Sequence, residues 1–170
     1  MTTVAALHVA PGRRLPTRSV TEVEVEAAAG IVGDRYHGSR HRQVTVQSAQ
    51  ALAEAAELFG APVPAGLTRR NVTVSDGVVP TAPGSLIRLG SQVVLEVVRV
   101  AAPCKLLDDT IGDGAQGVLR RGRGGAVCRV LAGGPVRLGD VVELGTDDVE
   151  LAPLRGAIGV PAPARRRHLP

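Results

Sequence analysis

The chain has 170 residues, a formal net charge of +4, two cysteines, one phenylalanine, one tyrosine and no tryptophan. This length suits one domain that folds without disulfide bonds, and we expect residues 1–150 to form it. The shortage of aromatic rings argues against nucleic-acid binding, which needs stacking side chains on a basic face. No apolar run approaches the roughly 18 residues that span a bilayer, and the residues after Met1 do not read as a secretory leader. We therefore expect a cytoplasmic protein with reduced thiols and no membrane partner.

The first elements are predicted to be strands. Residues 4–9 form a short apolar run that ends at Pro11-Gly12. Residues 20–27 alternate strictly between glutamate and valine from Glu22 to Glu26, which predicts a strand with one buried and one exposed face. A glycine-rich connection over residues 30–38 then leads to a strand at residues 43–47.

One helix is predicted, from the N-cap Ser48 to Phe59. Gly60 and Pro62 end it, since glycine favours the position after a helix and proline does not continue one. The residues that share its apolar face are Ala49, Leu52, Ala53, Ala56 and Phe59.

Most of the remaining chain reads as short strands separated by glycine and proline turns. The predicted strands are residues 71–75, 86–89, 93–100, 126–131 and 141–144, with turns at Pro83-Gly84, Gly133-Gly134 and Gly139-Asp140. This pattern predicts a mainly β (α+β) fold, a β-barrel or closed sandwich with one or a few short helices. Residues 107–125 give no assignment. Residues 151–170 are rich in Pro, Ala and Arg and are expected to be a flexible tail.

Chemistry is expected at Cys104, which follows the predicted strand at residues 93–100 and lies beside Lys105, the only lysine. A neighbouring ammonium and nearby arginines favour the thiolate, the form that attacks electrophiles, carries sulfur or binds a soft metal. The alternative is a buried cysteine that acts as a small hydrophobe. We assign that role to the second thiol, Cys128, which lies in a predicted strand.

A series of short motifs resembles the MOSC domain, named for the C-terminal part of molybdenum-cofactor sulfurases. Their order and spacing make the match specific, and it covers residues 4–144. The motifs are Gly33-Asp34-Arg35-Tyr36-His37-Gly38, Arg42-Gln43-Val44-Thr45, Arg69-Arg70-Asn71-Val72, Pro83-Gly84 with Ile87-Arg88-Leu89-Gly90, Pro103-Cys104-Lys105-Leu106, Gly124-Gly125, Arg129-Val130 and Gly139-Asp140.

The resemblance implies a barrel-like β fold and a functional role for Cys104, either as a ligand to the molybdenum of the pterin cofactor or as the carrier of a persulfide sulfur. It also implies a cofactor pocket that binds the phosphate and the pterin. Its cofactor-binding residues would be Arg35, His37, Arg42, Arg70, Asn71 and Lys105. Forked arginines and an amide suit such a ligand.

Three functions follow from this resemblance. The first is a molybdenum-dependent oxidoreductase that reduces N-hydroxylated small molecules and takes electrons from a partner reductase. The second is a sulfur carrier that receives its sulfur from a separate cysteine desulfurase. That desulfurase would hold the pyridoxal phosphate, because the chain lacks the domain that binds it in full-length sulfurases. The third is a noncatalytic module for a phosphorylated ligand.

Overall fold

The computed structural model describes residues 1–145. Residues 146–170, which include the predicted tail, lie outside the described residues. Eleven strands, three short α-helices and one 3-10 turn make up the described part. No helix within it is long and apolar enough to cross a lipid bilayer.

The larger sheet has eight strands in the order β11-β7-β8-β9-β5-β6-β1-β2. Its neighbours pair antiparallel, except for β5 and β6, which are parallel. In chain order these strands are β1 (Val4–Val9), β2 (Arg18–Val20), β5 (Val44–Ser48), β6 (Val72–Val74), β7 (Leu86–Leu89), β8 (Val93–Val100), β9 (Ala126–Ala132) and β11 (Val142–Leu144).

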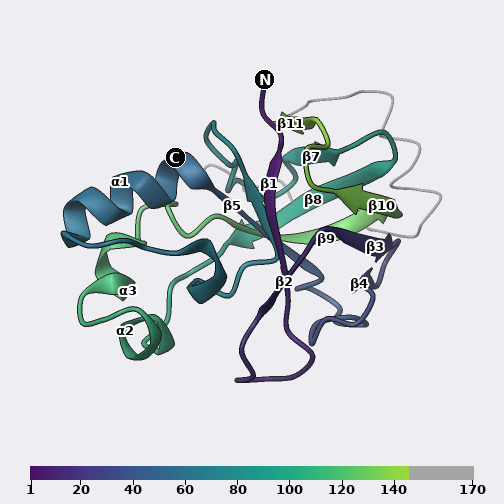
Figure 1. The fold of residues 1–170 in the computed structure, drawn as a ribbon. Coiled ribbons are helices and arrows are strands. Elements are labelled where there is room, and N and C mark those ends of the chain that lie inside the picture. The colour runs from purple at the N-terminus through teal and green to yellow at the C-terminus, as the bar shows by residue number, and fades with distance from the viewer. Residues whose placement is uncertain (146–170) are drawn as a thin grey trace, which may run out of the picture.

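The smaller sheet has the order β10-β3-β4 and contains β3 (Glu22–Glu26), β4 (Gly30–Ile31) and β10 (Gly134–Arg137). The predicted alternation in β3 is confirmed, because its two valines are buried and its three glutamates are exposed. These valines join the main apolar core together with side chains of the larger sheet, so the two sheets share one core. Figure 1 shows the smaller sheet on the opposite side of the molecule from the helices.

The mainly β prediction is confirmed, but the described residues form a mixed sheet and no closed barrel. The start of β1 does meet the segment before β11 through an isolated bridge between Thr3 and Val141. The Val4 N–H donates to the Asp140 carbonyl at 2.9 Å, and Val4 accepts from the Gly139 N–H at 2.8 Å. These contacts approach closure without a continuous ladder.

Three helices pack beside the larger sheet: α1 (Ala49–Phe59), α2 (Leu106–Thr110) and α3 (Ala115–Val118) (Figure 1). They share an apolar cluster that includes Leu52 and Ala55 of α1 and Leu107 of α2. The helix prediction for α1 is confirmed, and Gly60 ends it in the left-handed conformation. Its predicted face was wrong in one respect, because Ala53 is exposed and Ala55 is buried instead.

Several elements escaped the sequence prediction. Of the predicted run at residues 20–27, Val20 is the last residue of β2 and residues 22–26 form β3, and Gly134 begins β10 rather than only forming a turn. The 3-10 turn (Ala65–Leu67), β4, α2 and α3 were not predicted. All are short, and α2 and α3 are stabilised by packing against α1 rather than by a long apolar period.

Gly125 lies where two backbone segments approach closely. Its φ is +84°, and a Cβ there would collide with the carbonyl oxygen of Val46 in β5. Its own carbonyl accepts a 2.8 Å hydrogen bond from the N–H of Ala101. Glycine is therefore required where the segment before β9 joins the sheet.

We expect Gly125→Ala to lower the free energy of unfolding by at least about 3 kcal/mol, since it adds a backbone collision to an unfavourable φ. The matched control is Gly139→Ala, where φ is +86° but nothing lies within 4 Å of the added methyl group. That control should lose only about 1 kcal/mol. Urea unfolding of both variants measures the difference, and equal losses would contradict the close approach.

Candidate functional site: an arginine-lined cavity at Cys104

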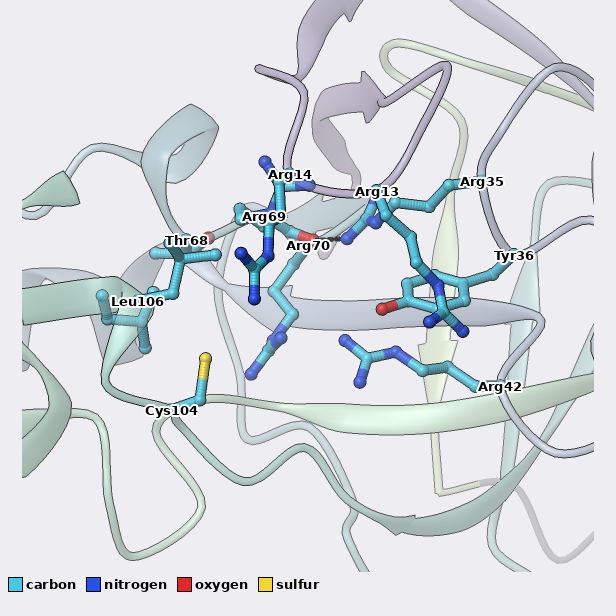
Figure 2. Close-up of a pocket in the computed structure, with 11 residues that line it drawn as sticks. Arg13, Arg14, Arg35, Tyr36, Arg42, Thr68, Arg69, Arg70, Cys104 and Leu106 are labelled. Carbon is cyan, nitrogen blue, oxygen red and sulfur yellow. Dashed lines mark hydrogen bonds between the residues drawn. The ribbon is translucent and has the colours of Figure 1, made fainter. Parts of the chain in front are cut away.

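A cavity of about 380 Å³ opens where four parts of the chain meet: the β1–β2 loop, the connection before β5, the turn before β6 and the segment after β8. Figure 2 shows the side chains around it. Its lining residues are Arg13, Arg14, Arg35, Tyr36, Arg42, Thr68, Arg69, Arg70, Cys104, Leu106 and Leu107.

The buried carboxylate of Asp34 organises the first wall of the cavity. It accepts hydrogen bonds from the backbone N–H of Ala10 at 3.0 Å and of Tyr36 at 3.1 Å. It also accepts from Arg35 Nη1 at 3.4 Å. Arg35 Nη2 in turn donates to the Arg69 carbonyl at 3.0 Å, so the guanidinium is held in place from two sides.

Tyr36, the only tyrosine, lies against two guanidinium groups. The ring centroid is 4.5 Å from the Cζ of Arg35 and 4.4 Å from that of Arg42. Such contacts place a cation over the negative face of the ring. Figure 2 shows the phenolic oxygen pointing into the cavity, toward the side where Arg70 lies. The wall therefore combines an aromatic surface with fixed positive charge.

Arg70 is the most deeply buried cation of the cavity, at 6% exposure. Its Nε donates to the Gly124 carbonyl at 2.9 Å, and its Nη2 donates to the Ala101 carbonyl at 3.2 Å. Burial, with a further contribution from Arg42, lowers the pKa of Arg70 to about 10. The group is still protonated at neutral pH, but its positive charge has no carboxylate partner among the lining residues.

Arg69 connects the cavity to the β1–β2 loop. Its Nη1 donates to the Leu15 carbonyl at 2.6 Å, and its backbone has a φ of +63°, which is unusual for a residue with a side chain. Burial and the neighbouring Arg35 lower its pKa. The loop that it holds brings Arg13 and Arg14, both exposed, to the rim.

Cys104 is exposed, and Figure 2 shows its Sγ pointing into the cavity on the side of Arg70. Its carbonyl accepts a hydrogen bond from the N–H of Leu107 at 3.0 Å, which fixes the chain as it enters α2. The other thiol, Cys128, is completely buried in the main core. Burial, together with the negative charge of Glu96, raises the pKa of Cys128 far above its ordinary value.

The cavity is electrostatically one-sided. Six of its eleven lining residues are arginines and none is acidic. Arg42 adds an unmet donor, because its Nε is buried without a hydrogen-bond partner among the described residues. An anion with several acceptor oxygens would supply the missing partners.

Comparison with known proteins decides the family. A family model for the MOSC domain matches residues 33–143, which include most of the cavity and Cys104. The chain belongs to the MOSC domain family. No curated protein gave a significant match.

Solved structures support the same fold for this MOSC domain. The YuaD protein from Bacillus subtilis superposes with a TM-score of 0.72 and 23% identity, over 84% of this chain and 94% of that one. YiiM from Geobacillus stearothermophilus gives a TM-score of 0.68 and 17% identity, over 88% and 77% of the two chains. YiiM from Escherichia coli gives 0.60 and 20%, over 96% and 80%. At these identities the likeness concerns the fold.

Four of the residues that the MOSC resemblance implied lie together in the cavity: Arg35, Arg42, Arg70 and Cys104. The other three do not line it. His37 is on the surface, with its Nε2 2.8 Å from Glu26 Oε2. Lys105 follows Cys104 but is exposed away from the lining.

Asn71 is the third of these residues, and it is buried in the sheet. Its Oδ1 accepts from the Thr45 N–H at 3.1 Å and from the Thr45 hydroxyl at 3.0 Å, and its Nδ2 donates to the His8 carbonyl at 3.2 Å. These bonds link β1, β5 and the chain that enters β6. The structure therefore places Asn71 as a support for the neighbouring Arg70.

Sequence reasoning missed several members of the cavity. Tyr36 and Arg69 stood inside quoted MOSC motifs but were not selected as site residues. Arg13 and Arg14 had one available signal, since two adjacent arginines follow the Pro11-Gly12 turn. The left-handed backbone conformations of Arg14 and Arg69, with φ of +61° and +63°, could not be predicted, because the sequence signal for a positive φ is a glycine and neither residue is one.

The contrast between the two thiols gives a direct prediction. Iodoacetamide at neutral pH should add one alkyl group to the folded protein, at Cys104, because Cys128 is buried and held in the neutral thiol form. Peptide mass spectrometry locates the modification. In denaturant both cysteines should react, and alkylation of Cys128 in the folded protein would contradict the structure.

Proposed function

We propose that the cavity binds the molybdenum cofactor, with Cys104 as the protein's ligand to the metal and the arginines as its phosphate site. The observation that carries this proposal is the exposed thiol in a cavity whose described lining contains six arginines and no acidic residue. Membership of the MOSC family supports it.

The charges of the cavity fit the phosphate of this cofactor. A phosphate dianion offers several acceptor oxygens to guanidinium forks, and the buried Nε of Arg42 lacks an acceptor among the described residues. The pKa of Arg42 is lowered first by burial, and Arg35 adds to that effect. A nearby anion would offset the free-energy cost of burying the positive charges of Arg42 and Arg35.

The available metal donors also fit a cofactor that brings ligands of its own. Within residues 1–145 no group of three or more His, Cys, Asp or Glu side chains could hold a metal ion. The cavity offers one soft donor, Cys104. A single thiolate does not retain a bare ion but suits a thiophilic metal that is already held by a dithiolene.

When bound, the cofactor supplies two-electron oxygen-atom transfer, and we propose N-hydroxylated small molecules as the substrates. The chain itself would orient such a substrate with the ring of Tyr36 and its two flanking guanidiniums. A separate reductase would be needed to supply electrons.

A second candidate function is supported by the exposure of Cys104. A sulfur carrier needs an accessible thiolate that accepts the outer sulfur of a desulfurase persulfide and passes it on, with release of the desulfurase thiolate. Cys104 meets the requirement for access because it is exposed just before α2, where a partner could reach it. The pyridoxal phosphate would belong to the desulfurase.

Molybdenum analysis separates these functions. Protein purified from a host that makes the cofactor should carry nearly one molybdenum per chain, and Cys104→Ser should lose at least about 90% of it because the metal ligand is gone. Cys128→Ala is the matched control. It removes a buried thiol and should keep the metal.

Two other results would contradict the leading proposal. Wild-type protein without molybdenum, but with an extra sulfur on Cys104 after incubation with a cysteine desulfurase, would establish the carrier. Phosphorylated-ligand binding that survives Cys104→Ser, with neither metal nor added sulfur, would leave only a noncatalytic binding module.

A further inference from the structure

A second cavity, of about 180 Å³, lies at the N-terminal end of α1. None of its lining residues lines the cavity around Cys104. Three segments form it: the start of α1, the loop after β6 and the segment before β9. The lining residues are Ser48, Gln50, Ala51, Glu54, Gly77, Val78, Val79, Thr81, Arg121, Gly122, Arg123 and Gly125.

Within residues 1–145, no side chain caps the N–H groups at the start of α1. The first N–H groups of an α-helix have no partner within the helix, and the helix dipole makes this end positive. Ser48 is the N-cap residue, yet its side chain caps none of these groups, and the first turn contains no acidic side chain. Gln50 is engaged elsewhere, since its Oε1 accepts the Gly77 N–H at 3.1 Å.

The hydroxyl of Ser48 is a second, independent sign of a missing ligand. Ser48 is only 2% exposed and lines the cavity, and its Oγ has no hydrogen-bond partner among residues 1–145. Buried hydroxyls are normally satisfied, because an unpaired one costs about 1 to 3 kcal/mol. An acceptor bound in the cavity would satisfy both this hydroxyl and the first N–H groups of α1.

Two arginines complete the positive wall. Arg121 is exposed with a φ of +60°, and Gly122 follows it with a φ of +83°, so the backbone turns sharply beside the helix. Arg123 Nε lies 3.8 Å from Glu54 Oε2, and its Nη1 donates to the Val118 carbonyl at 3.5 Å. Among the described residues of the lining, Glu54 alone is acidic.

We propose that this cavity is a binding site for the phosphoryl group of a small molecule, separate from the site at Cys104. The phosphoryl oxygens accept from the first-turn N–H groups of α1 and from the Ser48 hydroxyl, and Arg121 and Arg123 balance their charge. This cavity has less than half the volume of the cavity at Cys104, so we expect a phosphoryl group with a small substituent rather than a pterin cofactor.

Inorganic phosphate, titrated into the full chain and followed by two-dimensional ¹⁵N NMR, tests the proposal residue by residue. The backbone N–H signals of Gln50, Ala51 and Gly122 should shift together along one saturable curve. The arginine-rich cavity also attracts phosphate, so signals of Arg70 and Cys104 report that event separately.

Matched variants determine whether the second cavity is the source of the first curve. Ser48→Ala should lower the phosphate affinity reported by the α1 signals about tenfold, and Arg121→Gln should lower it at least about threefold, because each removes a donor or charge. Glu54→Gln should strengthen it by removing the competing carboxylate. Arg42→Gln, in the other cavity, should leave it unchanged. The spectra themselves show whether each variant is folded.

Three outcomes would overturn the proposal. The α1 signals could fail to shift at millimolar phosphate, or they could shift with the same affinity in Ser48→Ala and wild type. The third outcome is that Arg42→Gln, rather than Ser48→Ala, weakens the phosphate affinity reported by the α1 signals. The first would mean that water satisfies Ser48, and the others would mean that the response originates outside this cavity.

Discussion

The buried guanidinium of Arg70 is the interaction on which the arrangement of the cysteine cavity depends. Its two hydrogen bonds reach the carbonyls of Gly124 and Ala101, which come from segments on either side of the helices α2 and α3. Ala101 precedes Cys104 by three residues, so the same side chain that carries the deepest charge also fixes the approach to the thiol. Gly125, the residue after Gly124, packs closely against the backbone of Val46 in β5.

This arrangement places like charges close together, and their effect appears in the pKa values of the arginines. Burial lowers the pKa of Arg42, Arg69 and Arg70, and neighbouring arginines lower each further. Partly buried charges of the same sign reduce the stability of the folded chain. Their gathering around one cavity, facing an exposed thiol, is the feature on which the proposal of an anionic ligand rests.

Much of the fold could be predicted because the strands carry strong local patterns. The predicted bounds of β1, β7 and β8 agree with the structure, since each is a short apolar run with clear turn residues beside it. The helices α2 and α3 could not be predicted, because they are short and depend on packing against α1. The prediction of a closed barrel was wrong, because β1 and β11 meet only through backbone contacts around the isolated bridge between Thr3 and Val141 and form no continuous ladder within residues 1–145.

The site was predictable only where the family resemblance supplied it. Composition and spacing drew attention to Cys104, and the resemblance added Arg35, Arg42 and Arg70, which the structure brings to the same cavity. It did not separate these from Asn71, because the sequence alone does not show that the Asn71 amide is already hydrogen-bonded to Thr45 and His8. Nor could it reveal the second cavity, since the missing partner of Ser48 is visible only in three dimensions.

The central claim, that the cavity holds positive charge in excess of what the fold satisfies, is tested most directly by the stability of Arg42→Gln. The free energy of unfolding, measured by urea denaturation of ligand-free protein at low salt and neutral pH, should rise, because the substitution removes a partly buried charge that opposes Arg70 and Arg35. Arg120→Gln, at an exposed arginine outside the cavity, should leave it nearly unchanged. A lower free energy of unfolding for Arg42→Gln would contradict the account. It would mean that the Arg42 guanidinium stabilises the ligand-free protein and that its charge needs no bound anion.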